Sequence, residues 1–89
     1  MKTHKLKTHP KPFQAVADGL KPFELRVNDR DFRPDDNLLL CEYDPDTGIY
    51  TGREISAYTP YILYGGQFGL PSDMCVMTLA DVRLIKGDT

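Results

Sequence analysis

Apolar and polar residues alternate over several short stretches of this chain, and a period of two residues predicts β-strands. The segment Phe23–Val27 shows the clearest alternation. We expect its three apolar side chains to face the core. The two charged side chains between them, Glu24 and Arg26, are then expected to face outward, so this strand is the predicted carrier of functional groups.

Further stretches also have the character of strands. Thr3–Thr8 is polar around one leucine, as expected of an edge strand. Asn37–Tyr43 is almost wholly apolar, which is typical of a central strand buried on both faces. Ile49–Tyr64 is rich in Thr, Ile and Tyr, with Gly52 as a predicted bulge and Pro60 as a break, so we expect it to bend across two sheet edges. The last strands are expected at Met74–Leu79 and Val82–Ile85.

One helix is predicted early in the chain. Pro10 and Pro12 suit its first turn, where backbone N–H groups lack helical partners. Gly19 is placed to end it in a left-handed conformation and to turn the chain into the next strand. Apolar residues at helical spacing form one stripe, consisting of Phe13, Val16, Ala17 and Leu20.

Three connections complete the predicted fold. Arg33–Asp36 has proline at its second position and predicts a type I turn, and Asp44–Gly48 is the clearest hairpin turn. The connection Gly65–Asp73 holds three glycines and an apolar pair that could lie over a site. Residues 1–89 are therefore expected to form a single, mainly β (α+β) domain with one or two short helices, folded as a small, partly closed β-barrel of five to six strands.

The charge of the chain is unevenly distributed. The net charge of −2 argues against a strongly basic protein that coats nucleic acid. Residues 1–33, however, contain eight Lys and Arg against four Asp and Glu, whereas residues 34–89 contain three against nine. The basic N-terminal third either faces an anion or is an ordinary solvated surface.

Cysteine, histidine and apolar content exclude several classes of protein. Cys41 and Cys75 lie in apolar runs and are expected to be free thiols, since two cysteines form no disulfide framework. His4 and His9 lack neighbours at metal-ligand spacing, so we expect no metal and no cofactor. We see no signal peptide and no apolar run of the roughly 18 residues that span a bilayer, which predicts a cytoplasmic protein.

The polar residues around Phe23–Val27 predict a shallow pocket. Glu24 and Arg26 share a strand face and can pair, which would orient the guanidinium for a phosphate, a carboxylate or a base. The alternative is a surface ion pair worth about 0 to 1 kcal/mol. Lys21 can add a point charge or, if desolvated, a neutral amine base.

Other residues near this strand extend the predicted site. Asn28 and Arg30 are expected to contact a ligand, although the same loop suits a turn whose side chains bind local backbone groups. Tyr64 and Phe68, beside the glycines, are the favoured stacking platforms for a base. The predicted ligand-binding residues are Lys21, Glu24, Arg26, Asn28, Arg30, Tyr64 and Phe68.

The segment Gly19–Arg26 (GLKPFELR) resembles the G-x-K-x-x-E-x-R signature of the ASCH family, a branch of the PUA-like superfamily of small RNA-associated β-barrels. The sequence NDRDF follows at residues 28–32, starting two residues after Arg26. Together they are similar to a phage and bacterial ASCH-like family of unassigned function. Further similarities fall at His4, Leu6–Lys7, Phe13, Glu42–Tyr43, Thr51–Glu54 and Gly69–Leu70. One departure is the turn before the central strand, where relatives tend to have Gly-Asp and this chain has Pro34 to Asp36.

The resemblance implies a barrel beside a helix, with a cleft that binds RNA or a nucleotide through Lys21, Glu24 and Arg26. One branch of the family removes the acetyl group of N4-acetylcytidine with a lysine, a nucleophilic threonine and a glutamate. Lys21 matches that lysine, but Glu24 stands at the threonine position and cannot supply a hydroxyl nucleophile.

Binding of RNA or a nucleotide is therefore the preferred function. The alternative is a small amidohydrolase that acts on a modified nucleoside, with Lys21 activating water and Glu24 or Glu54 relaying protons. A protein-binding or antidefence role in a phage is a third reading, for which the sequence offers no distinguishing feature.

Overall fold

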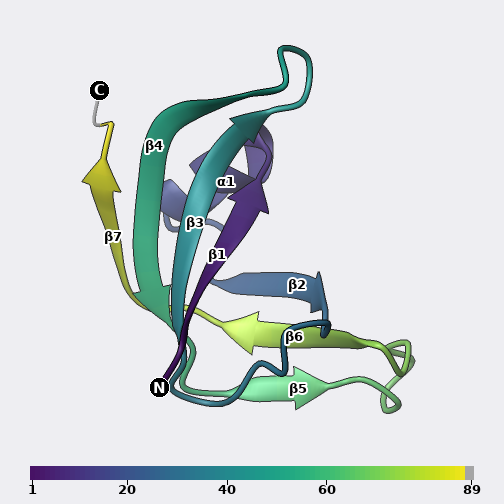
Figure 1. The fold of residues 1–89 in the computed structure, drawn as a ribbon. Coiled ribbons are helices and arrows are strands. Elements are labelled where there is room, and N and C mark those ends of the chain that lie inside the picture. The colour runs from purple at the N-terminus through teal and green to yellow at the C-terminus, as the bar shows by residue number, and fades with distance from the viewer. Residues whose placement is uncertain (88–89) are drawn as a thin grey trace.

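The computed structural model describes residues 1–87 of the chain, which contain one helix and seven strands arranged in two sheets (Figure 1). The four-stranded sheet has the order β1 (Thr3–Thr8), β3 (Asn37–Asp44), β4 (Ile49–Tyr58) and β7 (Ala80–Lys86). The three-stranded sheet has the order β2 (Phe23–Val27), β6 (Met74–Thr78) and β5 (Ile62–Tyr64). β1 runs parallel to β3, and all other pairs are antiparallel.

This architecture confirms a mainly β protein with one helix, but it differs from the prediction in detail. There are seven strands rather than five or six, and within residues 1–87 no ladder closes them into a barrel. As predicted, the chain breaks at Pro60, where it passes from β4 in one sheet to β5 in the other. It passes back at Leu79, between β6 and β7. The two crossings are adjacent, because the Thr78 N–H donates to the Tyr61 carbonyl at 3.0 Å.

The helix α1 (Pro10–Ala17) begins at Pro10, and Phe13 and Val16 on its inner side are buried as predicted. Gly19 has the predicted left-handed conformation, with φ of 76°. The apolar stripe is shorter than predicted, because the helix ends at Ala17 and Leu20 is 78% exposed. The backbone N–H of Leu20 instead donates to the Ala15 carbonyl at 2.9 Å and closes the helix end. α1, at eight residues, is too short to cross a bilayer, and residues 1–87 hold no other helix.

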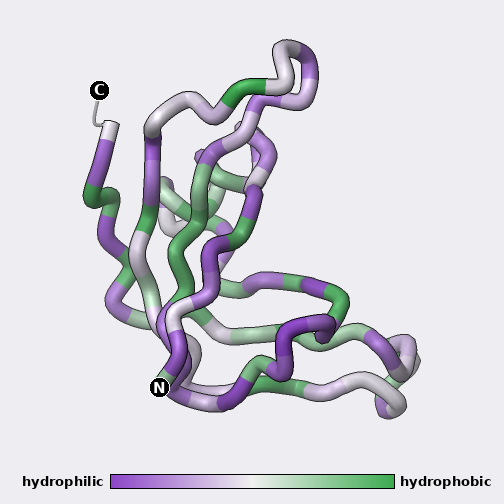
Figure 2. The backbone as a smooth tube through the Cα atoms, viewed as in Figure 1, coloured by the Kyte–Doolittle hydropathy of each residue, from purple (hydrophilic) through white to green (hydrophobic). Residues whose placement is uncertain are grey.

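The hydrophobic core lies between α1, the inner face of the four-stranded sheet and the inner face of the three-stranded sheet. Hydrophobic stretches follow β3 and β6, whereas the loop between β2 and β3 is mostly hydrophilic (Figure 2). Phe32 is the exception in that loop, since its side chain is only 1% exposed. The core consists of Leu6, Phe13, Val16, Phe32, Leu38, Leu40, Ile55, Ile62, Cys75 and Met77.

β2 is turned the opposite way from the prediction. Phe23, Leu25 and Val27 are 41%, 50% and 48% exposed, whereas Glu24 is only 2% exposed. The reason is that α1 packs on the four-stranded sheet, against β3 and β7, so that no described element covers the outer face of the three-stranded sheet. Glu24 can face inward because two cations pair with its carboxylate, as described below.

β3 is the predicted central strand, but only one of its faces is buried. Leu38 and Leu40 face the core, whereas Leu39 and Cys41 are half-buried on the open face. Gly52 forms the predicted bulge opposite this strand, with φ of 94°, where the β3–β4 register shifts between Cys41 and Tyr43. The four-stranded sheet therefore has an open face beside the lysines of β1.

The turn before β3 holds a residue in an unfavourable conformation. The Asp36 N–H donates to the Arg33 carbonyl at 3.1 Å, as in a β-turn, but Asp35 has φ of 73°. A positive φ at the third position is typical of a type II turn rather than the predicted type I turn, and it favours glycine.

We therefore expect Asp35→Gly to raise the free energy of unfolding by about 0.5 to 1 kcal/mol, because glycine relieves the left-handed strain. Urea denaturation measures the change. Asp46→Gly is the matched control, since Asp46 is also exposed in a turn but does not have a positive φ. It is expected to be neutral or destabilising, and equal stabilisation by both variants would contradict the strain at Asp35.

Candidate functional site

A cleft of about 290 Å³ opens between the end of β1, the start of α1 and the middle of β2. The cleft has two walls. One wall is formed by the end of β1 and the residue after it, with Lys7, Thr8 and His9. The opposite wall is formed by β2 and the residues before it, with Lys21, Glu24 and Arg26. The structure therefore brings together the three charged residues of the predicted G-x-K-x-x-E-x-R site.

Glu24 is the buried centre of this cluster, and its side chain is 3% exposed. Lys21 Nζ lies 2.6 Å from Glu24 Oε1, and Arg26 Nε lies 2.8 Å from Glu24 Oε2. Each carboxylate oxygen thus has its own cation. The alternative of a surface ion pair does not describe this arrangement, because the carboxylate is excluded from water and fixes both cations.

The local sequence explains why these groups meet. The left-handed Gly19 turns the chain so that Lys21 directly precedes β2, and Lys21 Nζ donates to the Phe23 carbonyl at 2.8 Å. Glu24 and Arg26 are two residues apart on a strand, so their side chains share a face. The cluster carries a net charge of +1 and keeps both cations partly open to the cleft, with Lys21 21% and Arg26 25% exposed.

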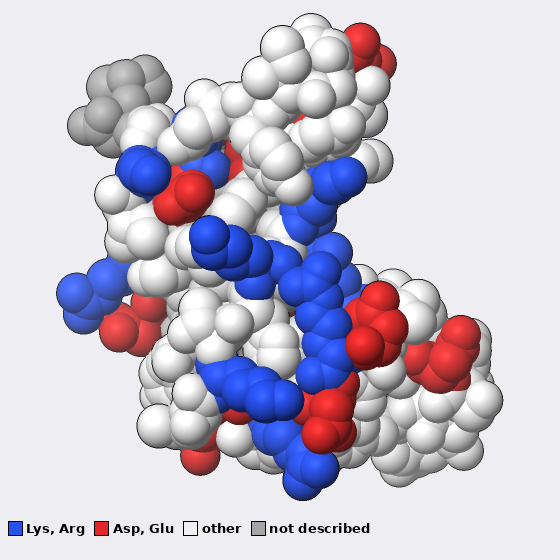
Figure 3. Space-filling view, viewed as in Figure 1, with Lys and Arg blue, Asp and Glu red and all other residues white. Residues whose placement is uncertain are grey.

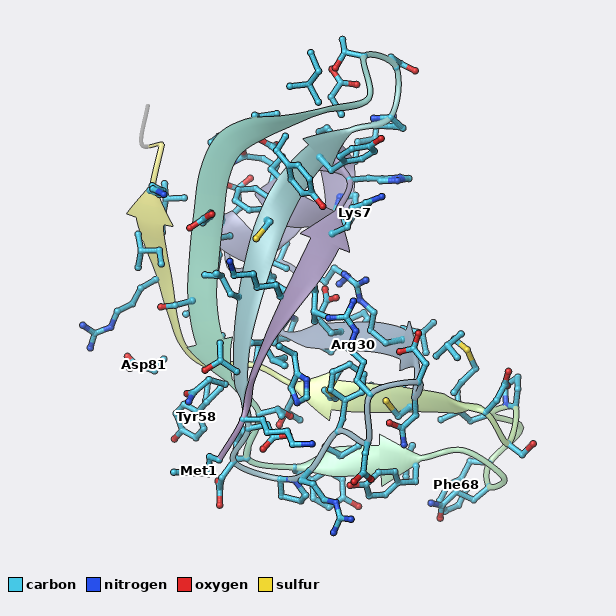
Figure 4. All side chains as sticks on the ribbon, viewed as in Figure 1. Met1, Lys7, Arg30, Tyr58, Phe68 and Asp81 are labelled. Atoms are coloured by element: carbon cyan, nitrogen blue, oxygen red, sulfur yellow. The ribbon has the colours of Figure 1, made fainter. Side chains whose placement is uncertain are left out.

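Two arginines also join the sheets at the free edge of β1. Arg26 Nη2 donates to the Lys7 carbonyl at 2.9 Å, and Arg30 Nη1 donates to the Lys5 carbonyl. β1 is an edge strand, so these carbonyls have no ladder partner on that side. Arg26 is thus both a wall of the cleft and a structural contact. Arg30 does not line the cleft as predicted but lies between the sheets (Figure 4).

The remaining predicted residues lie elsewhere. Asn28 Oδ1 accepts from the Phe32 N–H at 3.0 Å, which is the turn role left open by the sequence. The Tyr64 hydroxyl donates to the Phe32 carbonyl at 2.8 Å, outside the cleft. Phe68 is 90% exposed at the tip of the loop at residues 65–73, far from β1 (Figure 4). Neither aromatic residue faces the cleft as predicted, and this loop does not cover it.

Glu54 is also separated from the cleft. It lines a second cavity, on the open face of the four-stranded sheet, together with Cys41. Of the two carboxylates considered as proton relays for an amidohydrolase, Glu24 therefore lies beside Lys21 in the cleft, whereas Glu54 does not.

The cleft adjoins a band of positive charge. Lys5 and Lys7 project from the exposed side of β1, and Arg26 and Arg30 contact the backbone of the same strand. Figure 3 shows the Lys and Arg side chains gathered down the middle of this face. The pairings of the described residues give neither Lys5 nor Lys7 a carboxylate within 4.0 Å, so both ammonium groups are available to an anion.

Lys7, Thr8 and His9 were not among the residues predicted to line the cleft. The alternation of β1 does predict that Lys7 points outward, but which strand lies opposite β1 depends on the sheet order. The G-x-K-x-x-E-x-R motif therefore supplies only one wall of the cleft, and residues distant in sequence supply the other.

A buried pair of His4 and Asp36 joins β1 to the loop between β2 and β3. His4 Nε2 lies 2.8 Å from Asp36 Oδ2, which also accepts from the Arg33 N–H at 3.0 Å. Burial by itself raises the pKa of the Asp36 carboxyl, but hydrogen bonds from His4 and from the N–H groups of Arg33 and Lys2 outweigh it and hold the pKa below its ordinary value. The histidine thus has a structural partner. Residues 1–87 contain no group of three His, Cys, Asp or Glu side chains placed to bind a metal.

Comparison with known proteins places these residues in a family. A family model described as "Domain of unknown function (DUF3850)" matches residues 3–79, which include the whole cleft. An uncharacterized 12.9 kDa protein in the GpA 3' region of Escherichia phage P2 is 39% identical over 56 residues. That match covers 63% of this chain and 50% of the phage protein, so the chain matches about half the length of this relative.

Proposed function

The chain belongs to the DUF3850 family, a domain of unknown function, and from this premise we propose that it binds RNA or a nucleotide in the cleft of Lys21, Glu24 and Arg26. The observation that carries the proposal is one buried carboxylate that holds two cations at the wall of the cleft. Because the cations are fixed before a ligand arrives, little side-chain entropy is lost on binding. Such a pair suits the phosphate of a nucleotide.

The hydrogen-bond donors of the cluster are only partly used inside the protein. Arg26 bonds through Nε and Nη2, and Nη1 makes no hydrogen bond to the described residues. Lys21 Nζ makes two hydrogen bonds, so one of its three N–H groups remains for a ligand. The exposed ammonium of Lys7 adds a third cation at the opposite wall.

We further propose that the fold is that of an ASCH-like member of the PUA-like superfamily. The support is that the G-x-K-x-x-E-x-R residues Lys21, Glu24 and Arg26 all line one cleft, beside the start of the helix. This is where the resemblance of the sequence leads one to expect a ligand.

Titration of fluorescent RNA oligomers and free nucleotides tests the proposal. We expect wild type to bind and Lys7→Gln to weaken binding several-fold with a shallower salt dependence, because one phosphate contact is lost. We expect Arg26→Ala to weaken binding at least tenfold, with its folding checked by circular dichroism.

Arg83→Ala is the matched control, since Arg83 is an exposed cation on β7 that pairs with Asp81 and does not line the cleft. It is expected to bind like wild type. Absence of binding to every RNA and nucleotide, or equal binding by wild type, Lys7→Gln and Arg26→Ala, would overturn the proposed function.

A further inference from the structure

The open face of the four-stranded sheet has a cavity of its own, with a volume of about 330 Å³. It lies on the side of the sheet that carries the exposed β1 lysines, opposite the core. Its lining includes Lys5, Lys7, Cys41, Tyr50, Arg53 and Glu54.

Strand register explains the order of groups across this cavity. Lys7 pairs with Cys41 on β3, and Cys41 pairs with Glu54 on β4. The three side chains therefore form a row of cation, thiol and carboxylate across neighbouring strands. Lys7 also lines the cleft of Lys21 and Arg26, so the two cavities meet at this one side chain.

Glu42 also lines the cavity and pairs with Arg53, with Nη1 3.6 Å from Oε2, whereas the Glu54 carboxylate has little to bind inside the protein. Glu54 accepts one weak hydrogen bond, from the Cys41 thiol, with Sγ 3.9 Å from Oε2. Burial, followed by the charge of Glu54, raises the pKa of Cys41, so the sulfur stays a neutral donor rather than a nucleophile. The Glu54 carboxylate therefore has free acceptor capacity toward the cavity.

An aromatic platform stands beside these groups. Tyr50 is 54% exposed and contacts Tyr43 edge to face, with ring centroids 5.1 Å apart. Lys7 Nζ lies 4.3 Å from the centroid of the Tyr43 ring, which holds the ammonium close to both tyrosines. Exposed tyrosine next to lysine is the combination that binds single-stranded nucleic acid by stacking and by phosphate contacts.

We propose that this cavity is a second subsite for single-stranded RNA, and that the strand crosses β1 at Lys7 to reach the cleft. The inference rests on the proposed function and goes further, because it identifies the ligand as an oligomer rather than a free nucleotide. The two cavities, of about 330 and 290 Å³, lie close to the lower limit of the roughly 300 to 1,000 Å³ typical of ligand sites, so each suits about one nucleotide.

The charges determine how the nucleotide lies in the second subsite. Lys5 and Lys7 bind phosphate, whereas Glu54 repels phosphate and accepts hydrogen bonds from a base. Cytosine and adenine carry an exocyclic amino group that can donate to Glu54, and uracil does not. The subsite therefore prefers amino-bearing bases, with the ring stacked on Tyr50.

Fluorescence anisotropy with oligocytidine, oligouridine and uridine 5'-monophosphate tests the inference. Wild type is expected to bind oligocytidine at least fivefold more tightly than oligouridine. Tyr50→Ala is expected to weaken oligocytidine binding about tenfold, in line with the loss of one stacked base, and to leave uridine 5'-monophosphate binding in the cleft unchanged. Glu54→Gln is expected to abolish the preference for cytidine.

Tyr58→Ala is the control, since Tyr58 is a partly exposed tyrosine at the other end of β4, outside this cavity. It is expected to bind like wild type. If RNA binding is weakened by Arg26→Ala but not by Tyr50→Ala or Glu54→Gln, the second subsite is overturned and the proposed function stands. If wild type binds none of the three probes, both are overturned.

Discussion

Replacing Asp36 by Asn is expected to lower the free energy of unfolding by about 3 kcal/mol at neutral pH. Asp36 is 3% exposed, and its carboxylate accepts hydrogen bonds from His4 and from the backbone N–H groups of Lys2 and Arg33. Removing one charge of a buried pair costs about 3 to 5 kcal/mol, and the amide oxygen of Asn restores part of that loss. Urea denaturation followed by circular dichroism measures the change.

The effect of this substitution is expected to depend on pH. The pKa of Asp36 is lowered in the folded protein, so below the unfolded value of about 3.9 the unfolded chain binds more protons. The stabilisation by the carboxylate is therefore complete above pH of about 4 and is lost as the pH falls through the folded pKa. The difference in stability between wild type and Asp36→Asn should accordingly narrow in acid.

Asp46→Asn is the control for charge removal, because Asp46 is exposed in the hairpin turn. It is expected to change stability by less than about 0.5 kcal/mol at every pH. A loss equal to that of the control, or a difference between wild type and Asp36→Asn that stays constant down to pH 2, would contradict the structural role of Asp36.

Local sequence signals predicted the elements that depend on local physics. Three such predictions are confirmed. The strand Thr3–Thr8 follows from its alternation, and the helix start at Pro10 follows from the missing proline N–H. The left-handed conformation of Gly19 follows from the absence of a Cβ atom. The break at Pro60 was also correct, since proline cannot donate to a ladder. These features can be predicted without knowing which elements pack against them.

The face that each strand buries could not be predicted in the same way. Leu25 is exposed and Glu24 is buried, although hydrophobicity alone favours the reverse. Burial depends on which layer covers a sheet, and the one described helix covers the other sheet. The apolar run of β3 was likewise assigned two buried faces, whereas Leu39 and Cys41 lie on an open one.

The candidate site was predictable only where it is contiguous in sequence. The spacing of Lys21, Glu24 and Arg26 places them together through one turn and one strand. Tyr64 and Phe68 were predicted to belong to the site from their residue type and their position beside the glycines, and the structure places them elsewhere. Lys7 joins the two cavities through the pairing of β1 with β3, which a single sequence does not specify.

Replacing Glu24 by Ala is expected to lower the free energy of unfolding by about 3 kcal/mol, because Lys21 and Arg26 lose their shared anion in a partly buried position. Lys21→Ala is expected to cost less, about 1 kcal/mol, since Glu24 keeps its bond to Arg26. Thermal and urea denaturation of the two variants and of the double variant measure the coupling.

The double variant distinguishes a shared ion cluster from two independent surface contacts. If Glu24 binds Lys21 as the 2.6 Å distance indicates, Glu24→Ala should destabilise less in the Lys21→Ala background than in wild type, because one unpaired cation has been removed. Glu54→Ala is the control, since that carboxylate is half-buried and among residues 1–87 accepts a hydrogen bond only from a thiol, and it is expected to cost less than about 1 kcal/mol. If the changes in unfolding free energy of Glu24→Ala and Lys21→Ala are strictly additive, or if Glu24→Ala and Glu54→Ala destabilise equally, Glu24 does not position the two cations of the cleft. The arrangement of Lys21 and Arg26 would then need another cause.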